Sequence, residues 1–292
     1  MSRQVKNIIN ITAFLICIAL VNIAGQNIEL EIRGVNAFTY ILIAAVLIQV
    51  IFFIPSFLLK TEKYYDLVGS LTYVITISLA YFAVENKTTI DSIIYIYVMI
   101  WASRLGIYLF RRVQKDGKDV RFEKAKTHFF WFLQYWMGQA LWVSLTACAA
   151  IIAILSPEED TLPVLAMLGM ALWLTGFTIE SISDYQKRVF RKENNPSKSF
   201  IHTGLWARSR HPNYFGEITL WTGISIIALN TLAGIEYITL ISPVFVYILL
   251  TRMSGVNLLE RIADERYGEL EEYQRYKKNT PVLILKLSKD KN

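Results

Sequence analysis

The sequence has few of the residues that build disulfide frameworks and metal sites. Its 292 residues include only two cysteines and three histidines. Cys17 and Cys148 lie in separate apolar runs, so no disulfide framework can be drawn from them. Because paired Cys or His-x-x-x-His motifs are absent, we expect no bound metal. Neither a Walker A loop nor a Gly-x-Gly-x-x-Gly after a strand is present, so no soluble nucleotide-binding fold is indicated.

Long apolar runs dominate the sequence, and 54% of its residues are hydrophobic. This composition predicts an all-α, polytopic membrane helical bundle of seven or eight transmembrane helices. The eight candidate spans are 8–24, 37–59, 66–84, 90–110, 129–155, 162–182, 216–232 and 235–253. A count of seven spans is also possible, because only residues 231–234 separate the last two spans and they could form one broken element. The first run lacks a small-residue cleavage site, so we interpret it as a retained helix.

Basic residues gather on one side of this topology. Lys and Arg concentrate at 3–6, 60–63, 111–126, 187–210 and after 252, whereas the opposite loops contain only Arg33 and Lys87. Since basic loops stay in the cytoplasm, both termini are predicted to be cytoplasmic. The net charge of +6 is then explained by contact with the anionic surface of the lipid bilayer. Because this charge is divided among loops, no nucleic acid partner is expected.

Two cytoplasmic loops and a tail complete the predicted organisation. The loop 111–128 contains a predicted turn at Asp116–Gly117, and the loop 183–215 contains one at Asn194–Ser197. Beyond residue 256, apolar residues recur at helical spacing with charges between them. This pattern predicts a C-terminal amphipathic helix.

The run 208–217 places two arginines, a histidine and a glutamate at the entrance of an apolar helix. A charged side chain at this position costs free energy, because hydrocarbon cannot solvate it. The amides of a helix N-terminus also attract anions. The run therefore predicts a site for an anionic ligand at the membrane surface. Pro212 fits the first helical turn and Asn213 the helix cap. Glu217, one turn further, is expected to point inward.

Further polar residues lie in or near the apolar runs. Arg104 either extends to the interface or points into the bundle. Glu180 and Asp184, one turn apart, are interpreted as a functional pair on one helical face. Asn257 and Glu260 are the tail residues nearest the membrane and are also candidates. Most other polar residues of the tail are interpreted as a solvated face.

Several motifs in the C-terminal part resemble a known family. They are Asp184-Tyr185-Gln186-Lys187, Gly204-Leu205-Trp206, Ser209-Arg210-His211-Pro212-Asn213-Tyr214-Phe215-Gly216-Glu217, and Ser254-Gly255 before Glu260 and Arg266-Tyr267-Gly268. They resemble the bacterial DUF1295 branch of the steroid 5-alpha-reductase-like family. The resemblance covers residues 170–282, and 63–70 with Arg104-Leu105 extend it toward the N-terminus.

The resemblance implies a membrane-embedded reductase of the bacterial inner membrane. Such an enzyme uses NADPH to reduce a C=C bond conjugated to a carbonyl in a hydrophobic, lipid-like substrate such as a steroid or isoprenoid. Residues 1–127 would be the substrate-side half and residues 128–292 the cofactor-binding half of one integral domain. The candidate cofactor-binding residues are Glu180, Asp184, Arg191, Arg210, His211, Asn213, Tyr214, Glu217, Asn257 and Glu260.

The chain departs from the family pattern at the acid positions. Phe52 and Phe53 occupy the positions of the family's Gln-Glu pair, and Trp101 occupies that of its tyrosine. The proton donor is therefore left open among Tyr64, Tyr65, Asp66 and Tyr97. The candidate catalytic residues are Tyr64, Asp66, Tyr97 and Arg104.

Two other functions remain open. The Arg-His-Pro-x-Tyr-x-Gly run is also similar to membrane isoprenylcysteine and phospholipid methyltransferases, which bind S-adenosylmethionine. The cofactor-binding residues would then be Arg210, His211, Tyr214, Gly216 and Glu260. The third possibility is a non-catalytic lipid-binding membrane protein, because the family's acid residues are missing.

Overall fold

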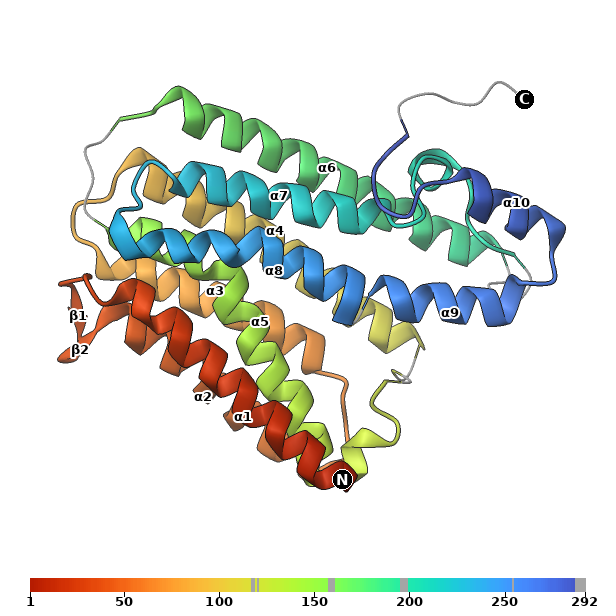
Figure 1. Cartoon of the computed structure of the whole chain (residues 1–292), viewed down its shortest axis with the longest axis horizontal. Helices are drawn as coiled ribbons and strands as arrows, with labels where there is room; N and C mark the ends of the chain where they lie inside the picture. The colour runs from red at the N-terminus through yellow and green to blue at the C-terminus, as the bar shows by residue number, and fades with distance from the viewer. Residues whose placement is uncertain (117–118, 120, 157–160, 195–198, 254, 287–292) are drawn as a thin grey trace. The chain divides into compact units, whose positions relative to one another are not determined.

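A computed structural model describes residues 1–116, 119, 121–156, 161–194, 199–253 and 255–286. This part of the chain is almost entirely helical (Figure 1). Its α-helices are α1 (Arg3–Asn22), α2 (Ala37–Leu58), α3 (Tyr65–Ala83), α4 (Thr89–Asp116), α5 (Phe129–Leu155), α6 (Val164–Glu193), α7 (Pro212–Ala228), α8 (Ile241–Ile248), α9 (Val256–Tyr267) and α10 (Glu271–Asn279). Two short strands, β1 (Glu31–Ile32) and β2 (Val35–Asn36), pair antiparallel between α1 and α2.

The membrane-spanning character is confirmed. In the described residues, seven helical stretches are long and apolar enough to cross a bilayer. They are Arg3–Gly25, Ala37–Leu58, Tyr65–Ala83, Thr89–Lys115, Phe129–Leu155, Val164–Glu193 and Gly234–Tyr267. Helix α7 has 17 residues and is not among them, although it covers most of the predicted span 216–232. The chain is therefore a multi-pass, all-α membrane protein.

Two predicted loops begin too early. Helix α6 continues to Glu193, so the first part of the predicted loop 183–215 is helical. Helix α4 likewise runs on to Asp116. Hydropathy marks only the part of a helix that lies in hydrocarbon, whereas the helix itself continues into water. In the two predicted turns, Gly117 and residues 195–197 fall outside the described residues.

The C-terminal part is more broken than predicted. The span predicted at 235–253 consists of a 3-10 helix (Gly234–Leu240), α8 and a π-helical turn (Leu249–Met253). The predicted amphipathic tail is confirmed as helical, but it forms the two helices α9 and α10. They are separated at Gly268, whose N–H still donates to the carbonyl of Asp264 at 2.9 Å.

The chain divides into two compact units. Unit 1 comprises residues 1–167 and 225–242, and unit 2 comprises residues 168–224 and 243–292. Within unit 1, α3 packs against α4, and α1, α2 and α3 pack against α5. Aromatic rings fill part of this core, including Phe53, Tyr65 and Trp136. The predicted division into a substrate-side half, 1–127, and a cofactor-binding half, 128–292, concerns function and not packing, so it stays a prediction.

Glycines bring α6 and α7 together within unit 2. A Cβ atom on Gly176 would lie 2.5 Å from the backbone nitrogen of Leu220 and 2.6 Å from the carbonyl oxygen of Gly216. A Cβ on Gly216 would lie 2.6 Å from the backbone nitrogen of Glu180. Only glycine permits this backbone approach, as is common between membrane helices. The crossing buries Glu180 and fixes the start of α7, where the candidate site lies.

Candidate functional site

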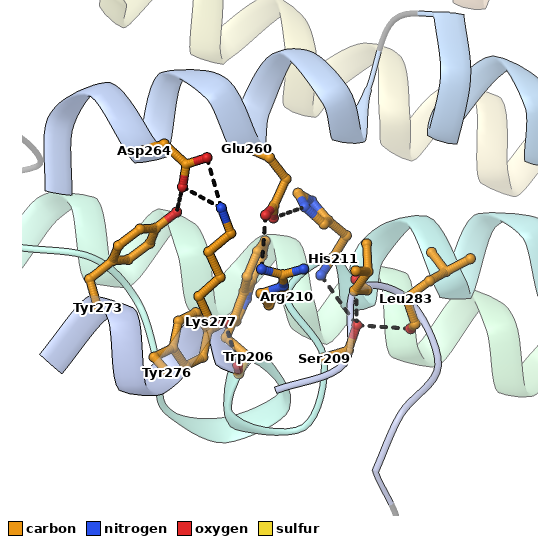
Figure 2. Close-up of polar contacts among 11 residues, drawn as sticks. Trp206, Ser209, Arg210, His211, Glu260, Asp264, Tyr273, Tyr276, Lys277 and Leu283 are labelled. Atoms are coloured by element: carbon orange, nitrogen blue, oxygen red, sulfur yellow. Dashed lines mark hydrogen bonds and ion pairs between the residues drawn. The ribbon is translucent and has the colours of Figure 1, made fainter. Parts of the chain in front are cut away.

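The loop before α7 presents Arg210 and His211 to a carboxylate of α9. His211 Nε2 lies 2.8 Å from Oε1 of Glu260, and Arg210 Nη1 forms an ion pair at 2.9 Å with Oε2 (Figure 2). The ring of Tyr214 is stacked on the imidazole, with a centroid distance of 5.5 Å and an interplanar angle of 8°. Sequence reasoning selected all four residues, but only the fold brings Glu260 to Arg210 and His211.

Burial sets the protonation state of His211, which is only 5% exposed. Desolvation lowers its pKa below the usual value, although the neighbouring carboxylate of Glu260 acts in the opposite direction. A neutral imidazole beside a carboxylate donates from Nε2, which leaves Nδ1 as an acceptor. Nδ1 of His211 and Nε of Arg210 are buried and have no hydrogen-bond partner among the described residues.

A cavity of about 170 Å³ lies beside this cluster within unit 2. Its basic lining residues are Lys187, Arg191, Arg210 and Arg266. Its aromatic lining residues are Phe190, Phe200, Trp206, Tyr267, Tyr273 and Tyr276. The ammonium group of Lys187 lies 4.8 Å from the ring centre of Trp206. Basic groups bind phosphates and aromatic faces bind planar rings, so the lining suits an anion that carries a ring.

The aromatic part of the cavity was missed by sequence reasoning. The ring of Phe200 lies 5.7, 5.2 and 5.3 Å from the rings of Tyr267, Tyr273 and Tyr276. The hydroxyl of Tyr276 donates to the carbonyl of Trp206 at 2.8 Å, and burial raises the pKa of this phenol. The only signal in the sequence is the helical spacing of the three tyrosines, which is equally typical of an amphipathic face.

The other predicted cofactor-binding residues have varied positions. Glu180 and Asp184 are buried one turn apart on α6, which confirms their common face, and Glu217 is buried on α7. Arg191 is exposed and lines the cavity. Asn257 is exposed on α9, and its amide donates to the carbonyl of Arg252 at 3.4 Å. The residues Glu180, Asp184, Asn213, Tyr214, Glu217 and Asn257 are not among those that line the cavity.

The predicted cap is corrected by the helix boundary. Helix α7 begins at Pro212, in agreement with the prediction of proline in the first turn. Asn213 is therefore the second residue of the helix and not its cap. A cap precedes the first helical residue, so this asparagine cannot fill that role.

The four predicted catalytic residues lie in unit 1. Tyr64 precedes α3 and is 51% exposed, with its ring 6.1 Å from that of Phe110. Asp66 forms ion pairs with Arg112 at 3.3 Å and Arg121 at 3.7 Å.

Tyr97 and Arg104 are half-buried on α4. Residues seven apart are separated by two helical turns, so these two side chains share one helical face. Two turns also separate them by roughly 10 Å along the helix axis, so a common role of the two side chains stays a prediction.

The fold and the site define a multi-pass, all-α membrane protein with a basic, aromatic cavity. A family model described as "protein of unknown function (DUF1295)" matches residues 52–280. The chain belongs to this family, and the predicted relation to the steroid 5-alpha-reductase-like family is confirmed.

Curated relatives match over shorter segments. The "3-oxo-5-alpha-steroid 4-dehydrogenase 1" of Mus musculus is 30% identical over 118 residues, which are 40% of this chain and 41% of that protein. The Homo sapiens protein of the same name is 37% identical over 60 residues, or 20% of this chain and 23% of its own length. The chain thus spans about two fifths of the length of the mouse relative. No solved structure matches the chain.

Proposed function

We propose that this protein is a membrane-embedded reductase that uses NADPH to reduce a C=C bond conjugated to a carbonyl in a lipid-like substrate. Family membership over residues 52–280 supports a shared architecture with enzymes of this type. The partial similarity to proteins named 3-oxo-5-alpha-steroid 4-dehydrogenase 1 supports the class of reaction.

The cavity in unit 2 is the observation that carries the cofactor proposal. It has four basic lining residues and one carboxylate, Glu260, which is already paired with Arg210. The unpartnered Nε of Arg210 and Nδ1 of His211 add a buried donor and a buried acceptor. These groups fit a phosphate and its adjoining hydroxyls. Whole drug-sized ligands occupy roughly 300–1,000 Å³, so this cavity would take only a phosphate-bearing part of a dinucleotide.

The same lining argues against S-adenosylmethionine. That cofactor carries a sulfonium, an ammonium and one carboxylate group, so it is a net cation that a basic cavity repels. A phosphate-bearing ligand is attracted by the same charges. The cavity therefore favours the reductase over the methyltransferase interpretation.

Bound NADPH would supply the hydride for the reduction. The chain's own residues would bind the cofactor through Arg191 and Arg210 and shield it with the aromatic rings around Phe200. The predicted catalytic residues Tyr97 and Arg104 carry a hydroxyl and a guanidinium, which are groups that can donate hydrogen bonds to a carbonyl oxygen. Hydrogen bonds to that oxygen stabilise the negative charge that develops there during reduction.

The proposal is tested by calorimetric titration of the detergent-purified full chain with NADPH, NADH and S-adenosylmethionine. We expect NADPH to bind and S-adenosylmethionine not to bind. A substrate screen with lipid-like enones, followed through loss of NADPH absorbance, then tests the reaction. Binding of S-adenosylmethionine alone would assign the chain to the methyltransferases. If neither ligand binds, the non-catalytic lipid-binding function is favoured.

A matched pair of arginines on α6 tests the cavity itself. Arg191 lines the cavity, whereas Arg188 is exposed beside the ring of Tyr185, with its guanidinium carbon 5.3 Å from the ring centre. Because Arg191 is exposed, its contact with a phosphate is worth about 1 kcal/mol, so Arg191→Gln should weaken NADPH binding about fivefold. Arg188→Gln should bind as the wild type does. Equal effects of the two substitutions would contradict a phosphate site in this cavity.

A further inference from the structure

The C-terminal segment 281–286 runs beside the loop that carries Arg210 and His211 (Figure 2). Three backbone hydrogen bonds join them: Arg210 N–H to Pro281 O at 2.9 Å, His211 N–H to Val282 O at 3.1 Å, and Lys286 N–H to Arg208 O at 2.9 Å. The segment does not line the cavity. It supports the site loop through the backbone and leaves the side chains of Arg210 and His211 available to the cavity.

The hydroxyl of Ser209 reinforces this pairing. Ser209 is 0% exposed, and its hydroxyl donates to the carbonyl of Leu283 at 2.8 Å. The same oxygen accepts the backbone N–H of His211 at 3.2 Å. One buried hydroxyl thus connects the C-terminal segment to the residue that contacts Glu260. Breaking this contact would leave a buried polar group without a partner, which costs free energy, so the contact resists rearrangement.

Arg210 and His211 are consequently restrained on two sides. Their backbone N–H groups bond to the C-terminal segment, and their side chains bond to Glu260 on α9. A loop without these contacts would sample many conformations, and ligand binding would have to order it. Restraint before binding removes that cost and raises affinity.

We propose that the segment 281–286 and Ser209 form a clasp that holds Arg210 and His211 in their binding positions, which makes Ser209 a positioning residue. This role rests on the proposed function for its ligand, NADPH. The clasp itself is a property of the ligand-free chain. It is therefore measurable whether or not NADPH is the ligand.

The test compares Ser209→Ala with the wild type in the full-length, detergent-purified protein. A second variant ends at Thr280 and removes the C-terminal segment. Ser181→Ala, a half-buried serine of α6 outside the clasp, is the matched control. Ser209→Cys keeps a weaker donor of similar size and should fall between the wild type and Ser209→Ala.

The first readout is the reaction of His211 with diethyl pyrocarbonate, measured by mass spectrometry without ligand. The exposed residues His128 and His202 serve as references within each sample. In the wild type and in Ser181→Ala, buried His211 should react slowly relative to both. In Ser209→Ala and in the truncated chain, local opening should raise the relative rate by roughly tenfold.

The second readout is NADPH affinity. Loss of one buried, bridging hydroxyl should weaken binding by roughly three- to tenfold in Ser209→Ala. If the truncated chain fails to fold, Ser209→Ala alone decides the question. Unchanged protection of His211 in Ser209→Ala would overturn the clasp.

The two readouts separate the two proposals. Failure of the wild type to bind NADPH would contradict the proposed function, while the labelling would still test the clasp. Increased labelling of His211 with unchanged NADPH affinity would overturn the positioning role, because an open loop would then bind equally well. Increased labelling together with weaker binding supports the proposal.

Discussion

Glu260→Gln removes the charge that holds Arg210 and His211 while preserving the size of the side chain. The carboxylate makes two contacts, at 2.8 and 2.9 Å, and the three side chains are 18%, 11% and 6% exposed. A charge-assisted contact of this kind contributes about 1.5–3 kcal/mol. The amide oxygen can still accept one of the two donors, whereas its NH₂ group faces the other.

The expected loss is therefore close to one charge-assisted contact. Partial exposure of Glu260 reduces it, which leaves a cost of about 2 kcal/mol in the free energy of unfolding. A change of this size should lower the melting temperature by roughly 8–16 °C if unit 2 melts like a domain of about 100 residues. The assay is thermal unfolding in detergent, followed by tryptophan fluorescence at a fixed heating rate because such unfolding is often irreversible.

Glu265 provides a matched control on the same helix. Its carboxylate is 70% exposed and lies 3.9 Å from Arg261, so Glu265→Gln should have almost no effect. The double variant Arg210→Gln/Glu260→Gln should be less destabilised than the sum of its single variants, because both remove one shared interaction. Equal melting temperatures for Glu260→Gln and Glu265→Gln would refute the reasoning that this contact stabilises unit 2.

Two further outcomes are expected. Because burial lowers the pKa of His211 below 6.5, the unfolded chain binds a proton at this residue near that pH and the folded chain does not. Its contribution to stability is thus complete above pH 6.5 and declines as the pH falls. Between about pH 8 and 5, the melting temperature of His211→Gln should therefore depend less on pH than that of the exposed control His202→Gln. Identical pH profiles of the two variants would contradict this. Separately, Gly176→Val should destabilise the protein by about 1–3 kcal/mol or more, since its Cβ would meet the backbone of α7. Gly138→Ala, where the nearest atom to a Cβ is a Phe14 side-chain carbon at 3.5 Å, should be tolerated, and similar melting temperatures would argue against the close approach of α6 and α7.

Helix positions within the apolar runs were predictable to within a few residues. Helix α5 spans Phe129–Leu155, as predicted, whereas α2 differs from its prediction by one residue at one end and α3 by one residue at each end. Prediction failed where a helix continued beyond the apolar run, as α6 does to Glu193. Outside hydrocarbon, helix length depends on packing and polar contacts, and hydropathy does not report these.

The candidate site was only partly predictable. The cluster 208–217 stood out because charged residues are costly beside a membrane helix. The aromatic rings around Phe200 did not stand out in the sequence, since tyrosines at helical spacing are equally typical of a packed face. The role of Ser209 could not be recognised from the sequence, because it depends on Val282 and Leu283, more than seventy positions later.

The sequence by itself determined that the chain crosses a membrane as helices. Inside a bilayer, each backbone N–H and C=O must be bonded within its own helix, so apolar length is sufficient to specify the element. Only the tertiary structure decided that Glu260 meets Arg210 and His211, and that the C-terminal segment supports them. Those contacts join residues of distant sequence position, and they depend on the packing of several helices together, which no local pattern encodes.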